Sequence, residues 1–162
     1  MGKNFLEPVR IHVVDDGQSR EVLYTAGLFD SPPGHPAREL PDGIGFAGFR
    51  VMSGNLETDW LAFLGASYFR SSGPFNQYGL SARAIAIDTG LPTPEEFPRF
   101  SEFYLAAGPG GTLIVHGLLN GPSVTGAYRF TIDRLTDNRE IHRVVMDIEA
   151  RLFARKDITR LG

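Results

Sequence analysis

The sequence predicts an all-β protein, an antiparallel β-sandwich built from short strands. Apolar and polar residues alternate with a period of two, most clearly over residues 124–133 and 143–152. The 19 glycines and 11 prolines fall mainly between apolar segments, which is typical of turns. About eight or nine such segments at regular spacing favour a sandwich. With 162 residues, the chain is long enough for one domain with its own core.

The N-terminal part of the chain is expected to form a hairpin. Residues 9–13 alternate between apolar and polar side chains, as in a half-buried strand. The pair Asp16-Gly17 then predicts a tight turn into a second strand over residues 21–24. Residues 30–43 hold four prolines and several polar residues, so they are expected to form a long loop.

The most informative stretch extends from Trp60 to Asp88. Residues 60–70 are apolar at both odd and even positions, which is typical of a strand covered on both faces. Residues 78–88 have a similar pattern. A strand over residues 45–52 is expected before this stretch, and a proline-rich connection over 91–98 after it.

The C-terminal half is expected to continue as strands. Residues 103–107 and 113–119 flank a glycine-rich turn and predict a strand pair. Helix propensity alone would allow a helix over 149–156, but the alternation over 143–152 favours a strand.

Composition excludes several classes of function. The formal net charge of -3, with no cluster of Lys or Arg, is too weak to indicate a nucleic acid or an anionic membrane as partner. No segment approaches the roughly 18 apolar residues of a membrane helix, so no membrane insertion is expected. Without cysteine there is no disulfide framework. Residues 1–5 lack the apolar core of an export signal, so we expect a cytosolic protein or one whose leader was removed.

Three short motifs are better explained by structure than by chemistry. Residues 43–48 fit G-x-G-x-x-G, but a proline-rich loop precedes them and a strand follows, so a loop with close backbone packing is expected rather than a nucleotide site. Residues 65–69 and 79–83 each lack the final glycine of a nucleophile elbow.

The four histidines share no metal-ligand spacing, so neither a metal nor another cofactor is expected. We expect His12 and His142 to be solvated on strands, and His116, within an apolar segment, to be a core histidine.

A concentration of polar side chains in the Trp60 to Asp88 stretch predicts a binding site. A half-buried arginine needs a partner, Ser and Tyr can both donate and accept hydrogen bonds, and aromatic faces suit the apolar faces of sugar rings. Such a mixture fits a polyhydroxylated ligand. The alternative is an internal salt bridge, such as Arg83 with Asp88 or Glu96. The candidate site residues are Tyr68, Arg70, Tyr78, Ser81, Arg83 and Asp88.

Glycoside hydrolysis needs two carboxyl groups on either side of the scissile bond. The candidates by proximity in sequence are Asp88, Glu95, Glu96 and Glu102. Because sequence gives no distances between them, no catalytic residue is assigned.

Several ordered motifs resemble the periplasmic glucan biosynthesis proteins of the OpgG/OpgD (MdoG) family, from Glu7 onward. The matching segments are Gly45–Phe49, Leu64–Arg70, Tyr78–Arg83, Ala86–Thr89, Glu95–Phe100, Ser123–Phe130 and Ala150–Lys156. The six candidate site residues all lie within these segments. Departures at residues 71–77, at Ala84 and in the short loop 54–59 affect the expected ligand contacts.

The resemblance implies a periplasmic protein that acts on osmoregulated periplasmic glucans, whose backbone is β-1,2-linked glucose. It implies that residues 1–162 form part of an N-terminal, galactose-mutarotase-like β-sandwich domain, with the rest of the sandwich and an immunoglobulin-like domain outside this chain. Some members are β-1,2-glucanases, and their general acid is expected in that other half. A glucan is therefore the expected partner. A lectin-like binder and a structural segment that forms a homodimer are the alternatives.

Overall fold

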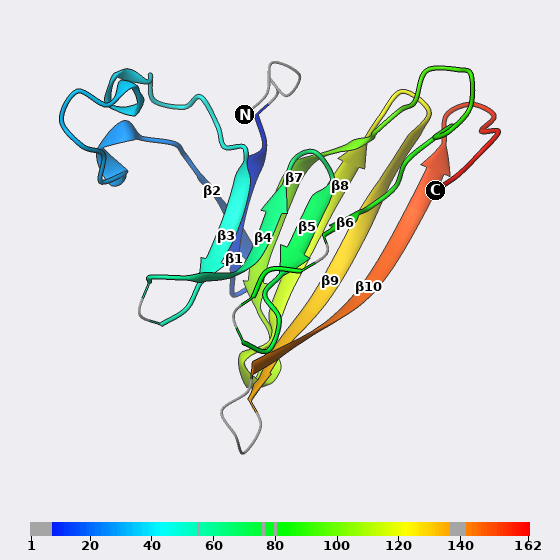
Figure 1. Ribbon diagram of the computed structural model, residues 1–162. Helices are drawn as coiled ribbons and strands as arrows, with labels where there is room; N and C mark the ends of the chain where they lie inside the picture. Colours follow the sequence, from blue (N-terminus) through cyan, green and yellow to red (C-terminus); the bar gives the residue numbers. More distant parts are fainter. Residues whose placement is uncertain (1–7, 55, 76, 80, 137–141) are drawn as a thin grey trace.

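The computed structural model describes residues 8–54, 56–75, 77–79, 81–136 and 142–162, and their regular structure is almost entirely β (Figure 1). A six-stranded sheet has, in spatial order, β10 (His142–Ala154), β9 (Val124–Thr136), β8 (Leu113–Asn120), β7 (Arg99–Ala107), β1 (Arg10–Asp15) and β2 (Gln18–Val22). A four-stranded sheet consists of β3 (Gly48–Met52), β4 (Asp59–Leu64), β5 (Tyr68–Ser71) and β6 (Ala82–Arg83).

Helical structure in the described residues is limited to three short 3-10 turns. These are η1 (Ala26–Leu28), η2 (Pro36–Glu39) and η3 (Pro109–Gly111). No helix in the described part of the chain is long and apolar enough to cross a membrane. Residues 1–7, which include the segment considered as a leader, lie outside the described residues.

The prediction that all strands are antiparallel is wrong at one pair. β1 lies parallel to β7, with Arg10 opposite Glu102 and Val14 opposite Ala106. The four-stranded sheet is antiparallel throughout, so one sheet is mixed and the other is not. Between β2 and β7 the chain builds the whole four-stranded sheet before it returns beside β1. Alternation of side chains identifies a strand but carries no information on the direction of its neighbour.

Most of the expected turns are present. Asp16 and Gly17 both have positive φ and join β1 to β2 in a two-residue turn, as predicted. The strand expected over 60–70 is instead a hairpin, because Ser67 takes a φ of 52° and the chain reverses between β4 and β5. Among the described residues of 78–88, β6 and isolated bridges are the only β-structure. The segment 149–156 is strand up to Ala154, as the alternation indicated.

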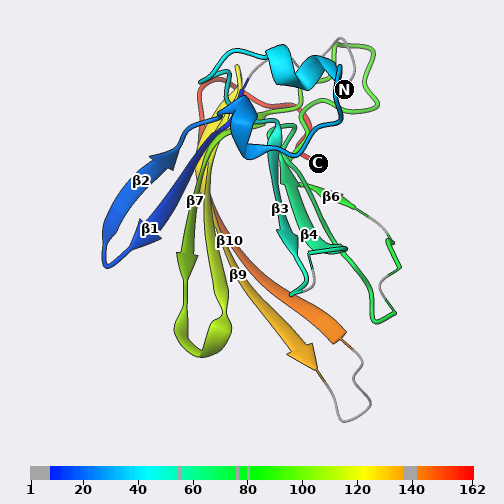
Figure 2. The ribbon, with the colours of Figure 1, turned by 90° about the vertical axis from the view of Figure 1, so that its left-hand side faces the viewer.

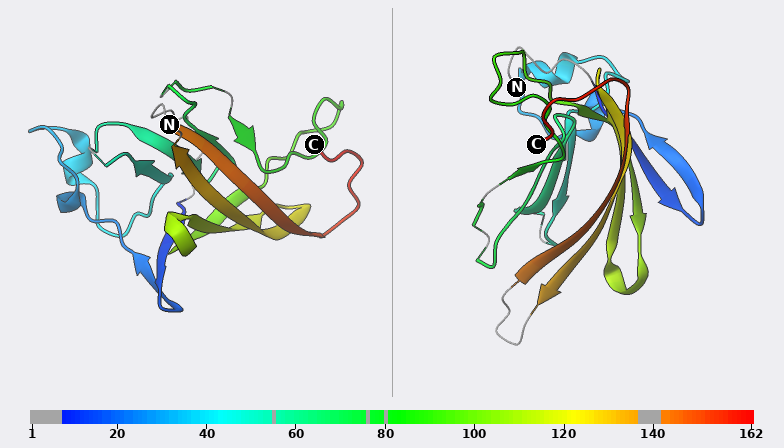
Figure 3. Two further views of the ribbon diagram at one scale, coloured as in Figure 1. Left: turned by 90° about the horizontal axis from the view of Figure 1, so that it is seen from below. Right: turned by 90° about the vertical axis from the view of Figure 1, so that its right-hand side faces the viewer.

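A cluster of phenylalanines lies in the core between the two sheets. Phe63 of β4 lies 4.9 Å from Phe130 of β9 and 5.7 Å from Phe103 of β7, measured between ring centroids. All three side chains are fully buried. Figure 2 shows the sheets lying together at one end and splaying apart at the other, and the right-hand view of Figure 3 shows the same splay.

A bulge at Trp60 changes which face of the small sheet carries each residue of β4. Val51 is paired with Leu61, but Met52 is paired with Asp59, so Trp60 is the extra residue. Trp60 and Leu61 are both buried in the core as a result. Beyond the bulge the alternation is reset, and Asp59 lies on the face turned away from the core.

The glycine motif at residues 43–48 has a structural role, as expected. A Cβ atom on Gly48 would lie 2.0 Å from the carbonyl oxygen of Phe63, because β3 and β4 approach closely at this pair. The motif leads into β3, and no helix follows it.

The expected environments of two histidines are reversed. His12 is 7% exposed because it stacks on Tyr104 of β7 at 4.3 Å, although we expected it to be solvated. His116 is exposed, although we expected it in the core: it alternates with the buried Val115 and Gly117 and lies on the opposite face of β8.

Candidate functional site

The outer face of the small sheet gathers most of the predicted site residues. Tyr68 and Arg70 alternate with the buried Phe69, so they project from the face opposite the core. Arg83 of β6 lies directly across from Tyr68. We refer to five of the polar side chains on this side of the sheet as the polar face. Its members are Asp59, Tyr68, Arg70, Tyr78 and Arg83.

Asp59 is the centre of the tightest group on the polar face. Arg70 donates a hydrogen bond from Nη2 to Asp59 Oδ2 at 2.8 Å. Tyr78 donates from its hydroxyl to Asp59 Oδ1 at 2.6 Å and to the Asp59 carbonyl oxygen at 2.9 Å. The Arg70 guanidinium also lies over the Tyr78 ring, 4.1 Å from its centre. These contacts hold three side chains from separate segments in one arrangement.

The charges around Asp59 favour its ionised form. The hydrogen bond from Tyr78 is the largest cause that lowers the pKa of this carboxyl, followed by the positive charges of Arg70 and Arg50. Burial raises the pKa of the carboxyl, but by less than these contacts together lower it. One nitrogen of the Arg70 guanidinium, Nη1, is buried without a hydrogen-bond partner among the described residues. This nitrogen is shielded from solvent, so the contacts of Arg70 with Asp59 and Tyr78 hold its side chain within the protein.

Arg83 does not pair with Asp88 or Glu96, the two partners considered from the sequence. It donates from Nη1 to the carbonyl oxygen of Ala66 at 2.8 Å, and its guanidinium lies 4.8 Å from the centre of the Phe97 ring. The salt bridges on this sheet instead join Asp59 to Arg70 at 2.8 Å and to Arg50 at 4.0 Å.

The other two predicted residues, Ser81 and Asp88, lie on either side of β6 in the sequence. Ser81 is exposed just before β6. Asp88 belongs to the segment after β6, where it accepts a hydrogen bond from the backbone N–H of Arg160 at 3.0 Å and takes a φ of 57°. Asp88 thus contributes to holding the C-terminal segment of the chain.

The three glutamates considered as catalytic candidates are each hydrogen-bonded in their own surroundings. Glu95 accepts from the backbone of Gly90 at 3.1 Å. Glu96 accepts from both the backbone and the hydroxyl of Ser123. Glu102 accepts from Arg10 and from the Tyr104 hydroxyl. These contacts give each carboxylate a structural role, and no acid/base pair is assigned.

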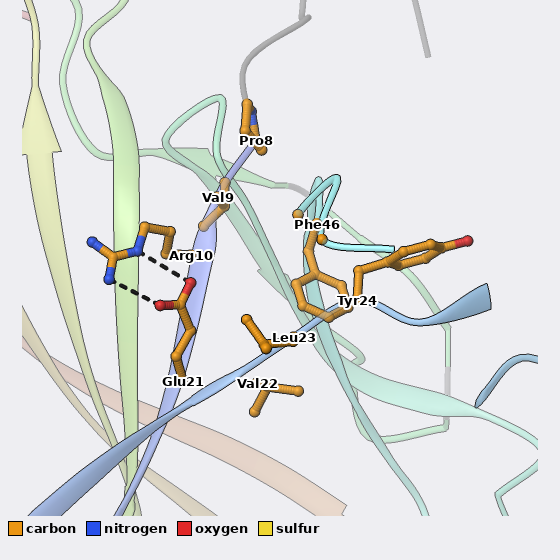
Figure 4. A pocket seen from close by; sticks show the side chains of 10 residues that line it. Pro8, Val9, Arg10, Glu21, Val22, Leu23, Tyr24 and Phe46 are labelled. Atoms are coloured by element: carbon orange, nitrogen blue, oxygen red, sulfur yellow. Dashed lines mark hydrogen bonds and ion pairs between the residues drawn. The ribbon is translucent and has the colours of Figure 1, made fainter. Parts of the chain in front are cut away.

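A separate pocket of about 270 Å³ lies between β1, β2 and the strand-like segment at Phe46. Val9, Val22, Leu23 and Phe46 give it apolar walls, while Arg10 and Glu21 form an ion pair at 2.9 Å on one side (Figure 4). None of the six predicted site residues lines it.

Comparison with protein families gives one match to the whole chain. The family model described as "Periplasmic glucan biosynthesis protein, MdoG" matches residues 1–162. The chain belongs to the MdoG family.

Named MdoG-family relatives are similar over the whole of this chain. Glucans biosynthesis protein D 1 of Ralstonia nicotianae is 50% identical over 166 residues, and protein D 2 of the same organism is 44% identical over 175. Glucans biosynthesis protein D of Xanthomonas campestris pv. campestris is 46% identical over 166 residues. Each alignment covers 100% of this chain and 30 to 32% of the relative. The chain therefore spans about a third of the length of these relatives.

Asp59 is the residue of the polar face that sequence reasoning missed in this MdoG-family chain. It is one residue before Trp60, and strict alternation would place it on the same side as the buried Leu61. The signal that could have identified it is the adjacent pair of large apolar residues Trp60-Leu61, because a bulge is the way a strand buries two neighbours on one face.

Proposed function

We propose that this chain contributes a glucan-binding surface to a periplasmic protein that makes or processes β-1,2-linked glucan. One observation carries the proposal: Tyr68 and Arg83 form a cross-strand pair on the polar face, next to Arg70. Aromatic rings stack on the apolar faces of sugars, and guanidinium groups donate to several hydroxyls at once. The family name, with its reference to the periplasm and to glucan, supports both the location and the ligand class.

Isothermal titration of the chain with linear β-1,2-glucan tests this proposal. Tyr68→Ala and Arg83→Ala are each expected to weaken binding about tenfold, because each removes a contact worth about 1–2 kcal/mol. Tyr24→Ala and Arg20→Ala are matched controls, since both residues lie outside the polar face. Unchanged binding in both polar-face variants, with unaltered thermal unfolding, would remove these residues from the site.

Whether the surface only holds glucan or belongs to a hydrolase is a separate question. We propose a binding role for this chain, because each candidate glutamate is occupied by its own structural contacts. Chromatography of the glucan after incubation with the chain is expected to show intact oligosaccharides. Shortened products would contradict this role.

A structural role in a homodimer is the second candidate, and β10 favours it. This strand of 13 residues lies at the edge of its sheet, and Val145, Ile148 and Phe153 are more than a third exposed. Antiparallel pairing of two copies about Glu149 would set Asp147 opposite Arg151 and Val145 opposite Phe153. Because an unpaired edge favours such pairing, light scattering is expected to detect a dimer that Ile148→Lys dissociates. A wild-type monomer would exclude this role.

A further inference from the structure

A hollow of about 400 Å³ lies at the end of the large sheet, and none of the six residues predicted as the site lines it. Arg99, the first residue of β7, and Asn120, the last residue of β8, face each other across the two strands. The turn into β9 and the first residue after β10 complete the walls. The lining residues are Phe97, Arg99, Asn120, Gly121, Pro122 and Arg155.

The lining of this hollow is positively charged. Arg99 and Arg155 both contribute to it, and none of its lining residues is acidic. Arg155 is anchored by one hydrogen bond, from Nη1 to the carbonyl oxygen of Gly121 at 2.8 Å. A guanidinium has five N–H groups in a planar fork, so the fixed Arg155 side chain keeps further donors for a ligand.

Two charged residues outside the lining lie close to the hollow. Glu96 lies against Gly121, but both of its carboxylate oxygens accept hydrogen bonds from Ser123. A third guanidinium, that of Arg83, lies over the ring of Phe97, which forms one wall. Arg83 and Glu96 therefore border the hollow, whose own lining includes two arginines and no acidic residue.

We infer that this hollow is a binding site for a small oxyanion, a phosphate or a carboxylate group. Arginine forks bind both groups through paired hydrogen bonds, and such charge-assisted bonds are about twice as strong as neutral ones. The Asn120 side-chain amide adds a neutral donor from the adjacent strand. A neutral sugar would use only the hydrogen-bond donors of these side chains, whereas an anion also gains from their charge. The inference is independent of glucan binding on the polar face.

Nuclear magnetic resonance of the 15N-labelled chain in low-salt buffer tests the inference, with inorganic phosphate and acetate as separate probes. At least one anion is expected to produce saturable shifts at the Asn120 side-chain amide and the Gly121 backbone amide, at concentrations on the order of millimolar. Tighter binding of phosphate would identify a phosphate site, and tighter binding of acetate a carboxylate site.

Two variants test whether the lining side chains bind the anion. Arg155→Gln is expected to weaken the affinity at least about fivefold by removing one fork. Asn120→Asp places a negative charge in the wall and keeps the hydrogen bond from Arg155 to Gly121. It therefore tests the site even if Arg155→Gln unfolds the turn. Arg20→Gln, with the same change of charge on the distant strand β2, is expected to leave the affinity unchanged.

Two results would overturn the inference. One is the absence of saturable shifts with either anion. The other is an equal loss of affinity in Arg20→Gln, which would indicate an adventitious response to net charge only. Titration with neutral β-1,2-glucan separates this site from the proposed function, because Asn120→Asp is expected to retain glucan binding whether or not the anion site is present.

Discussion

The hydroxyl of Tyr78 donates a 2.6 Å hydrogen bond to the carboxylate of Asp59, although the two residues are 19 positions apart. Tyr78 is about half exposed, whereas Asp59 is buried. The contact therefore connects an irregular surface segment to the first residue of β4. With Arg70 stacked on the Tyr78 ring, it fixes the end of the polar face at which the strand bulge occurs.

Replacement of Asp59 by asparagine is expected to lower the free energy of unfolding by about 2–3 kcal/mol. The variant leaves the Arg70 guanidinium, which is 17% exposed, without its carboxylate partner. Urea denaturation measures the change. Asp15→Asn, at an exposed position of β1, is the matched control and is expected to change stability by less than about 0.5 kcal/mol. Equal stability of the two variants would contradict a structural role for the ion pair.

The contribution of Asp59 to the free energy of unfolding is expected to decrease as the pH falls. The folded-state pKa of its carboxyl lies below the unfolded value of about 3.9. The native state therefore binds the proton less tightly than the unfolded state does. The stabilisation is fully present above about pH 4–5 and is lost as the pH falls through the folded pKa.

This pH dependence is measured by comparing wild type with Asp59→Asn. The difference in unfolding free energy is expected to be constant between pH 5 and pH 7 and to shrink below about pH 4. A difference that grew on acidification would show that folding does not lower the pKa of Asp59.

Tyr128→Phe is expected to cost about 1 kcal/mol of stability. The Tyr128 hydroxyl donates to the carbonyl oxygen of Ala84 at 3.0 Å and so joins β9 of the large sheet to the segment after β6. Phenylalanine keeps the buried ring but leaves that carbonyl without this donor. Thermal unfolding measures the loss, with Tyr24→Phe as control, because the Tyr24 hydroxyl points away from the neighbouring pocket in Figure 4. Equal midpoints for the two variants would exclude a role for this bond.

Gly48→Ala is expected to destabilise the chain by about 3 kcal/mol. The new methyl group would overlap the backbone of Phe63 and Leu64, which cannot move without separating β3 from β4. Gly27→Ala is the control, since a Cβ there meets nothing within 4 Å. Circular dichroism during chemical denaturation measures both variants. A Gly48→Ala variant as stable as the control would contradict the close approach of the strands.

The elements that the sequence predicts well are strands with one buried face and one solvent-exposed face. Residues 124–133 alternate cleanly and form the first ten residues of β9, and the Asp16-Gly17 turn follows from local backbone preferences alone. His116 could have been placed correctly by the same rule, because its neighbours on both sides are buried. The apolar character of the whole segment suggested a buried histidine, whereas the alternation of side chains places position 116 on the exposed face.

The features that sequence does not give depend on contacts between distant segments. His12 is buried only because Tyr104, from a strand much later in the chain, stacks against it. The same applies to the candidate site: Tyr68, Arg70 and Arg83 follow from strand alternation and pairing, but Asp59 joins them only through the bulge at Trp60. Asp88 was grouped with them by proximity in sequence, while the structure ties it to Arg160.

The parallel pairing of β1 with β7 also has a kinetic consequence. Arg10 and Glu102 are hydrogen-bonded across 92 positions, whereas β7 to β10 follow one another through short connections. Closing the long loop costs more chain entropy than closing the short ones. We therefore expect refolding to form the C-terminal meander first and to add the N-terminal hairpin last. Pulse-labelling hydrogen exchange measures this order, and early protection of Val13 and Val14 amides would refute it.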